Sequence, residues 1–295
     1  GYGMLLAQNT IRDRLKAKVE KIAEKTTDEA VKAAAAEYLE TYTVGATNGT
    51  ATDKLVAALE ALDCDCEERA EVLKNKDFLA KKSQWIFGGD GWAYDIGYGG
   101  VDHVLASKKD INIMVFDTEV YSNTGGQSSK STPTGAIAQF AAGGKETKKK
   151  DMASIAMSYG YVYVAQISMG ADFNQTVKAI AEAEAYPGPS LIIAYAPCIN
   201  HGIKIGMSKA QTEEKNAVAV GYWNNFRYNP AAEDKKFTLD SKAPTASYRD
   251  FIMGEVRYNS LTRAFPQRAE QLFEKAEKYA EEKYEKFAHM ASEEE

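Results

Sequence analysis

The amino-acid sequence predicts an α/β fold: a doubly wound, mostly parallel sheet with a helical segment before it and a long C-terminal helix after it. Two patterns predict this. Apolar, β-branched runs alternate with helix-length segments; the runs lie at 84–87, 111–116, 161–167 and 190–196, and the segments between them include 151–159 and 173–185. Continuous apolar strands separated by helices indicate a parallel sheet covered on both faces. Residues 5–82 instead place apolar side chains at three- and four-residue steps, which is the period of amphipathic helices. We therefore predict a helical segment at 1–83, part of the same domain or inserted in it, and an α/β domain with a C-terminal extension at 84–295.

The helical segment is expected to contain three or four helices. Its apolar positions include Ile11, Leu15, Val19 and Ile22. Residues 44–50 are rich in turn-forming residues and are predicted to be a loop, after which Thr52 and Asp53 offer an N-cap to a helix that ends near Leu62. The charge-rich faces of these helices favour a solvated surface over a binding site.

The C-terminal third is expected to add smaller elements to the sheet. Residues 208–222 predict a helix, and 222–239 contain two short aromatic strand candidates that Asn229-Pro230 separates. Residues 266–290 predict a long helix with charged faces, and 292–295 are expected to be a frayed end.

Composition excludes several classes of function. The net charge of −6 provides no basic surface for nucleic acid. No apolar stretch approaches the roughly 18–20 residues that span a bilayer. With three cysteines, a disulfide framework is not expected, and a reducing cytoplasm fits the composition.

Polar residues follow the predicted strands. Asp90 lies between Gly89 and Gly91 after the first strand, and the segment 118–123 follows the second. Ligands of parallel sheets bind beyond the carboxyl ends of the strands, so Asp90, Thr118 and Cys198, which all follow strands, can converge on one edge. The Asp90 carboxylate, the Thr118 hydroxyl and the Val120 carbonyl are hard oxygen ligands of the kind that Mg²⁺ takes beside substrate phosphates. The pattern predicts a metal-diphosphate site.

The residues around Asp90 fit this prediction. The two flanking glycines are expected to let the backbone turn sharply and come close to a ligand. A helix predicted over 92–107 would point its amino end at the diphosphate.

The motifs resemble those of a known family. Gly89-Asp90-Gly91 with Asn123 resembles the diphosphate motif of thiamine diphosphate enzymes, and the longer words at 89–100 and 117–130 resemble pyruvate:ferredoxin (flavodoxin) oxidoreductases in particular. Further matching words lie at 159–164, 184–193 and 194–202. The resemblance runs from about Trp85 to about Tyr284 and covers the carboxyl-terminal thiamine diphosphate-binding region of that family.

The resemblance implies an activity and a set of site residues. Enzymes of this family oxidise pyruvate with coenzyme A to acetyl-CoA and CO₂, and pass electrons through iron–sulfur clusters to ferredoxin or flavodoxin. It assigns the thiamine diphosphate site to Gly89, Asp90, Gly91, Thr118, Val120 and Asn123. Of these, Asp90, Thr118 and the Val120 carbonyl would hold Mg²⁺, and Asn123 would have a catalytic role in positioning the oxo-acid adduct. Cys198 would give one ligand to a [4Fe–4S] cluster.

The same resemblance indicates what lies elsewhere. The other three cluster ligands and the activating glutamate of the family are expected before Gly1, and Glu119 is at best a positioning group. Cys64 and Cys66 are interpreted as incidental, and His201 as a loop histidine with a local hydrogen bond. The chain starts Gly1-Tyr2-Gly3-Met4 and is expected to be a piece of a longer polypeptide that forms a homodimer. The piece on its own is expected to be inactive.

Three alternatives remain. The first keeps the chemistry with another 2-oxo acid as substrate. The second is a non-oxidative thiamine diphosphate decarboxylase or carboligase, which would need no cluster and so leaves Cys198 unexplained. The third is a scaffold module with a degenerate site, which the joint presence of Asp90, Thr118 and Asn123 disfavours.

Overall fold

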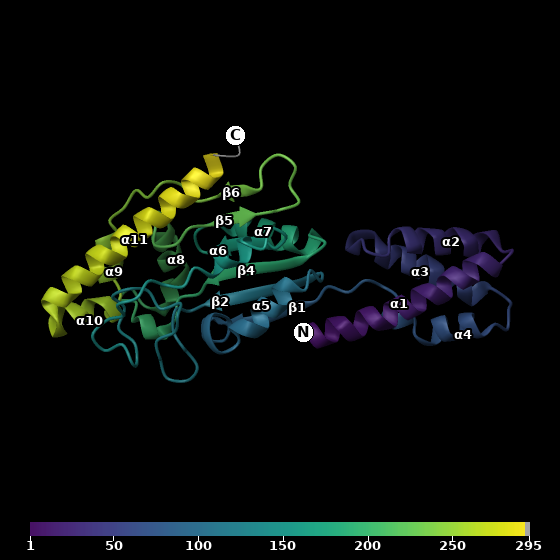
Figure 1. The fold of residues 1–295 in the computed structure, drawn as a ribbon, viewed down its shortest axis with the longest axis horizontal. Helices are drawn as coiled ribbons and strands as arrows, with labels where there is room; N and C mark the ends of the chain where they lie inside the picture. The colour runs from purple at the N-terminus through teal and green to yellow at the C-terminus, as the bar shows by residue number, and fades with distance from the viewer. Residues whose placement is uncertain (293–295) are drawn as a thin grey trace. The chain divides into compact units, whose positions relative to one another are not determined.

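A computed structural model describes residues 1–292 of the chain. The chain divides into two compact units, Gly1–Trp85 and Ile86–Glu295 (Figure 1). None of the helices in residues 1–292 combines the length and the apolar character that crossing a bilayer requires.

The first unit is helical. It contains α1 (Tyr2–Lys25), α2 (Glu29–Glu40), α3 (Gly45–Ala61), α4 (Glu67–Lys74) and a short 3₁₀ turn, η1 (Lys76–Phe78). The Asp28 side chain caps α2 by accepting hydrogen bonds from the amides of Ala30 and Val31. Side chains spaced at helical steps, such as Leu15, Val19 and Leu55, form its buried core.

The prediction of a loop at 44–50 is wrong. Helix α3 already begins at Gly45, and Thr52 and Asp53 lie inside it. The cause is tertiary: Asn48 is fully buried, and its Oδ1 accepts hydrogen bonds from Arg12 Nη2 (3.2 Å) and from the Lys81 amide (2.6 Å). These contacts outweigh the low helix propensity of this Gly-, Thr- and Asn-rich stretch.

The second unit is built on a six-stranded sheet in the order β1-β2-β4-β3-β5-β6. Its strands are β1 (Trp85–Gly89), β2 (Ile111–Asp117), β3 (Tyr163–Ile167), β4 (Pro189–Tyr195), β5 (Phe226–Tyr228) and β6 (Phe237–Leu239). Strand β4 pairs in parallel with β2 from Ile111↔Pro189 to Asp117↔Tyr195, and also in parallel with β3. The two short aromatic strands β5 and β6 add antiparallel pairs beside β3. The predicted mostly parallel sheet is confirmed.

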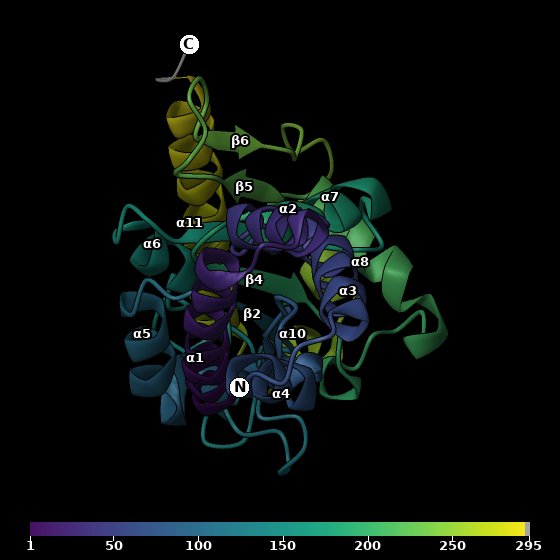
Figure 2. The same cartoon turned by 90° about the vertical axis from the view of Figure 1, so that its right-hand side faces the viewer.

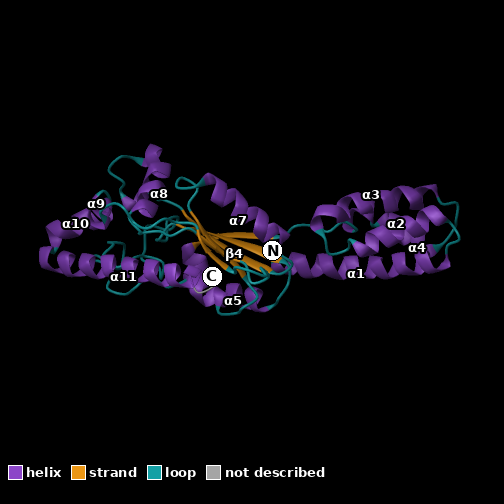
Figure 3. Cartoon of the chain, turned by 90° about the horizontal axis from the view of Figure 1, so that it is seen from above, coloured by secondary structure: helices purple, strands orange, loops and turns teal. Residues whose placement is uncertain are grey.

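Helices cover both faces of this sheet. Those that contact its strands are α5 (Tyr98–Ala106), α6 (Met152–Met157), α7 (Phe173–Ala185) and α11 (Pro266–Ser292). The unit also contains α8 (Ala210–Ala219), α9 (Tyr248–Met253) and α10 (Val256–Ala264). Figure 3 shows α5 and α7 on opposite sides of the strands, as a doubly wound fold requires. The sequence did not predict α9 and α10.

The predicted C-terminal helix is present as α11 and lies beside β6 in two perpendicular views (Figures 1 and 2). Phe287 on α11 is fully buried, and its ring centroid lies 4.7 Å from that of Phe226 and 5.6 Å from that of Phe237. Of the predicted frayed end, Ser292 closes the helix and 293–295 lie outside the described residues.

Candidate cofactor and metal site

The loops after β1 and β2 bring together the three oxygen groups that the sequence singles out. Asp90 is 1% exposed, and its Oδ1 accepts hydrogen bonds from the Thr118 hydroxyl (2.7 Å) and amide (3.2 Å). The Thr118 hydroxyl also lies 3.0 Å from the Val120 carbonyl oxygen. The adjacency of β1 and β2 in the sheet therefore places one carboxylate, one hydroxyl and one carbonyl side by side.

Two serines that the sequence analysis missed hold the second oxygen of Asp90. The hydroxyls of Ser129 and Ser131 each lie 2.6 Å from Asp90 Oδ2, and they donate to it. Both side chains are buried. The run of hydroxyl residues over 128–132, with a single lysine among them, was the available signal.

All the residues predicted to bind the cofactor line one cavity of about 510 Å³. It is lined by 87–92, Phe116, Thr118 and 120–124. Its volume falls in the range of small-molecule sites, roughly 300–1,000 Å³. The rings of Phe87 and Phe116 stack with centroids 6.2 Å apart and form an aromatic wall, and Asn123 is exposed at the cavity.

The structure corrects the expected role of the flanking glycines. Neither Gly89 nor Gly91 has a positive φ, so neither is required for a left-handed turn. A Cβ at Gly91 would lie 2.5 Å from the Tyr121 ring, whose hydroxyl donates to the Gly91 carbonyl (3.1 Å). Gly91 therefore makes room for Tyr121, whereas a Cβ at Gly89 would meet only the Phe116 carbonyl oxygen, at 4.0 Å.

The helix expected over 92–107 begins differently. Residues Gly91–Ile96 form wide π-helical turns, closed by the Gly97 amide on the Trp92 carbonyl (2.7 Å), and α5 follows. π-Helical turns are rare in proteins, and those that occur often lie at functional sites.

The loop after β4 carries Cys198 to the same edge of the sheet. Cys198 is 8% exposed, and its Sγ accepts hydrogen bonds from the Asn200 amide and side-chain Nδ2, both at 3.5 Å. His201 closes the short turn that follows, and its Nε2 lies 2.8 Å from the Thr118 carbonyl oxygen. Because that oxygen can only accept, Nε2 carries the proton. The hydrogen bond of His201 is thus not local as expected; it ties the Cys198 loop to the loop after β2.

Burial and the nearby Arg257 lower the pKa of His201 to about 3, so the ring is neutral. His201 is therefore a neutral, fully buried histidine whose Nε2–H group links two loops.

Cys64 and Cys66 lie in the helical unit. They are in the connection between α3 and α4, where both are partly exposed and the Cys64 carbonyl accepts a hydrogen bond from Arg69.

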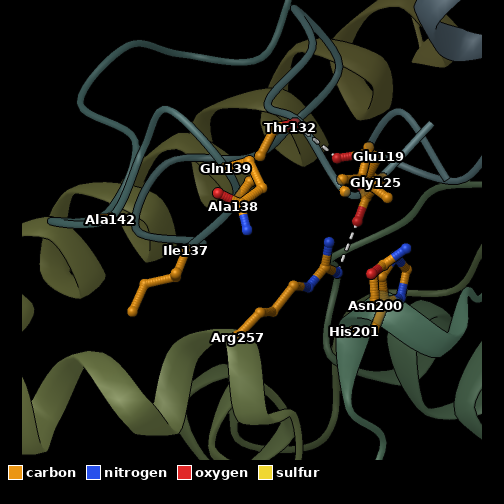
Figure 4. A pocket seen from close by; sticks show the side chains of 12 residues that line it. Glu119, Gly125, Thr132, Ile137, Ala138, Gln139, Ala142, Asn200, His201 and Arg257 are labelled. Atoms are coloured by element: carbon orange, nitrogen blue, oxygen red, sulfur yellow. Dashed lines mark hydrogen bonds and ion pairs between the residues drawn. The ribbon is translucent and has the colours of Figure 1, made fainter.

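A buried charged cluster lies behind the Thr118–Val120 turn. Glu119 has a φ of 59° and points its carboxylate into the protein, where Lys149 Nζ (2.8 Å), Arg257 Nη2 (2.7 Å) and the Tyr222 hydroxyl donate to it. Figure 4 shows Glu119 and Arg257 facing each other beside a cavity of about 270 Å³. Burial opposes the ionisation of Glu119, but Lys149 and Arg257 outweigh it and lower its pKa to about 2.

The neighbouring Asp117 behaves differently. Burial raises its pKa to about 6 in spite of an ion pair with Lys149 at 2.8 Å, and its Oδ2 also accepts a hydrogen bond from Tyr94 (2.9 Å). The single lysine therefore serves two carboxylates, of which Glu119 is the more fully ionised.

The chain is similar to known proteins over nearly its whole length. Residues 70–194 match the family model described as the thiamine pyrophosphate enzyme, C-terminal TPP binding domain. The chain is 54% identical over 299 residues to a pyruvate:ferredoxin oxidoreductase of Moorella thermoacetica, with 99% of this chain and 25% of that protein covered. It is 52% identical over 301 residues to a pyruvate-flavodoxin oxidoreductase of Enterobacter agglomerans, with 99% of this chain and 26% of that protein covered. It is 50% identical over 297 residues to a pyruvate-flavodoxin oxidoreductase of Klebsiella pneumoniae, with 100% of this chain and 25% of that protein covered. The chain thus spans about a quarter of the length of these relatives. This similarity over nearly the whole chain confirms the resemblance to the pyruvate:ferredoxin (flavodoxin) oxidoreductases that the motifs predict.

Proposed function

We propose that this chain is the part of a pyruvate:ferredoxin or pyruvate:flavodoxin oxidoreductase that holds the Mg²⁺-diphosphate end of thiamine diphosphate and gives one thiolate to a [4Fe–4S] cluster. The parent polypeptide, a cytoplasmic homodimer in this proposal, converts pyruvate and coenzyme A to acetyl-CoA and CO₂. It passes the electrons to ferredoxin or flavodoxin. The similarity to relatives with these names and the geometry around Asp90 support the proposal.

The spacing of three oxygens carries the metal assignment. Octahedral Mg²⁺ binds oxygen at 2.0–2.1 Å, so neighbouring ligands lie about 2.9 Å apart. Asp90 Oδ1 and the Val120 carbonyl oxygen lie 2.7 and 3.0 Å from the Thr118 hydroxyl oxygen. One hydroxyl has a single proton and cannot donate fully to both neighbours. A cation bound by all three oxygens would satisfy them together.

The other residues of the cavity have separate tasks. When bound, thiamine diphosphate supplies the nucleophilic carbon that decarboxylation of a 2-oxo acid needs. Ser129 and Ser131 hold the Asp90 carboxylate in one orientation. Phe87 and Phe116 offer an apolar wall, and Asn123, which lines the cavity, would position the oxo acid.

The environment of Cys198 fits a cluster ligand. Iron–sulfur clusters are held by cysteine thiolates, and hydrogen bonds to the sulfurs tune their potentials. The two N–H groups of Asn200 that point at Cys198 Sγ would stabilise a thiolate. A cubane needs four such ligands, and we expect the other three from the parts of the parent polypeptide outside this chain. Replacing Cys198 by serine in the parent polypeptide should lower its iron content and its low-temperature EPR signal; unchanged cluster content and electron transfer would favour the non-oxidative alternative.

The experiment that tests the function is anaerobic reduction of a low-potential dye by the parent polypeptide. Pyruvate, 2-oxobutyrate, 2-oxoglutarate and indolepyruvate are offered separately, each with and without coenzyme A. Reduction that depends on coenzyme A and prefers pyruvate supports the proposal. Preference for another acid keeps the chemistry and changes the substrate, and CO₂ release without dye reduction contradicts an oxidoreductase.

The isolated chain should show no complete turnover. It holds one part of the cofactor site, and the activating glutamate is expected in a domain that it lacks. Sustained pyruvate oxidation by the 295-residue chain alone would contradict this assignment.

A further inference from the structure

The turn that offers the Thr118 and Val120 oxygens is centred on a residue in an unfavourable backbone conformation. Glu119 has a φ of 59°, in the left-handed region that favours glycine. This conformation lets Thr118 and Val120 face each other, with the hydroxyl of one 3.0 Å from the carbonyl of the other. A non-glycine residue stays in such a conformation only where its surroundings fix it.

The surroundings of Glu119 fix it at both ends of its backbone. Its amide donates to Asp117 Oδ1 (3.1 Å), and its carbonyl accepts from the Thr132 hydroxyl (2.6 Å). These bonds hold the residue on both sides of its strained φ.

Its side chain is held by three further donors. Lys149, Tyr222 and Arg257 converge on the carboxylate, which is 1% exposed. Figure 4 shows the contact with Arg257. The three donors come from the loop before α6, the segment after α8, and α10. The carboxylate therefore anchors the turn to three separate segments of the unit and takes no part in the oxygen set around Asp90.

We propose that Glu119 is a positioning residue: its buried carboxylate, gripped by Lys149, Tyr222 and Arg257, holds the Thr118–Val120 turn in the conformation that binds Mg²⁺. The inference rests on the proposed function. Loss of these contacts to the Glu119 carboxylate would let the turn relax toward ordinary φ values and separate the Thr118 and Val120 oxygens. The protein would then need more Mg²⁺ to bind thiamine diphosphate, although every oxygen ligand is still present.

The test uses Glu119→Gln in the parent polypeptide. Glutamine has the same shape, but its amide nitrogen must face one of the donors that now point at the carboxylate. Thiamine diphosphate binding is measured by calorimetry over a series of Mg²⁺ concentrations. We expect the Mg²⁺ concentration for half-saturation to rise about tenfold or more, with binding recovered at high Mg²⁺.

Glu182→Gln is the matched control. The Glu182 carboxylate also accepts from a tyrosine hydroxyl (Tyr163, 2.9 Å) and an arginine (Arg227, 2.7 Å), away from the turn. It should lower the unfolding temperature without changing the Mg²⁺ requirement. An unchanged requirement in Glu119→Gln, or an equal shift in Glu182→Gln, would overturn the inference.

Two further variants keep the result interpretable. If Glu119→Gln does not fold, Tyr222→Phe, which removes one of the three donors, must shift the Mg²⁺ requirement in the same direction; no shift overturns the inference. Asp90→Asn removes a proposed metal ligand and should weaken Mg²⁺-dependent binding more than either. If Asp90→Asn has no effect, the proposed metal site itself fails, which separates that failure from a failure of the role of Glu119.

Discussion

Replacing Gly91 by alanine would place a methyl carbon 2.5 Å from the Tyr121 ring, whereas the same change at Gly89 meets no atom closer than the Phe116 carbonyl oxygen at 4.0 Å. Ordinary contacts between such carbons begin near 3.4 Å, so the Tyr121 ring must move by roughly 1 Å in Gly91→Ala. Overpacking of this kind costs about 1–3 kcal/mol. Loss of the hydrogen bond from Tyr121 to the Gly91 carbonyl adds about 1 kcal/mol.

We expect the two substitutions to differ in unfolding temperature, although both glycines belong to the same Gly-Asp-Gly motif. For a domain of this size, about 2–4 kcal/mol lowers the unfolding temperature by roughly 4–15 °C. Gly89→Ala should stay within about 0.5 kcal/mol of the native chain. Thermal unfolding followed by circular dichroism measures both. Equal unfolding temperatures for the two variants, or a less stable Gly89→Ala, would refute the reasoning.

Three further predictions concern stability. Burial raises the pKa of Glu255 to about 7, so the free-energy cost of burying its ionised carboxylate is absent below about pH 4.5 and grows as the pH rises to 7. The free energy of unfolding of Glu255→Gln, relative to that of the native chain, should therefore rise by roughly 3 kcal/mol across that range. Urea unfolding at pH 4.5 and 7.5 that shows no such rise would contradict it. Phe287→Ala, in the aromatic cluster under α11, should cost about 3–5 kcal/mol in urea unfolding, while Phe140→Ala, at a side chain 93% exposed, should cost less than about 0.5 kcal/mol. Arg12→Met removes the donor to the Tyr42 carbonyl and one of the two donors to each of the Leu79 carbonyl and Asn48 Oδ1. It should destabilise the helical unit by about 2–4 kcal/mol, seen as faster amide hydrogen exchange there and not in the sheet.

The sequence predicted the four longer strands of the sheet well because each of them lies on a mainly apolar run of the sequence. The run at 111–116 became β2, and the side chains after it lie where a parallel sheet collects its ligands. The antiparallel pairing of β5 with β3 could not be predicted in the same way, since a three-residue strand has too short a pattern to specify its partner.

The candidate site was predicted in part. Asp90 and Thr118 stand in recognisable motifs, but Ser129 and Ser131 lie in a long irregular loop without periodicity. Their part in the site depends on a bond to a residue some 40 positions earlier. The start of α3 shows the same limit, because Asn48 reads as a turn former until its partner Arg12 is known.

The contact between Glu119 and Arg257 also bears on when the turn can form during synthesis of the chain. Arg257 follows Glu119 by 138 residues, and a ribosome adding about 5–20 residues per second needs roughly 7–28 s to cover that interval. Until α10 has emerged and packed, the turn beside Asp90 lacks one of its anchors. Loading of the cofactor should therefore follow, and not guide, the folding of the nascent domain.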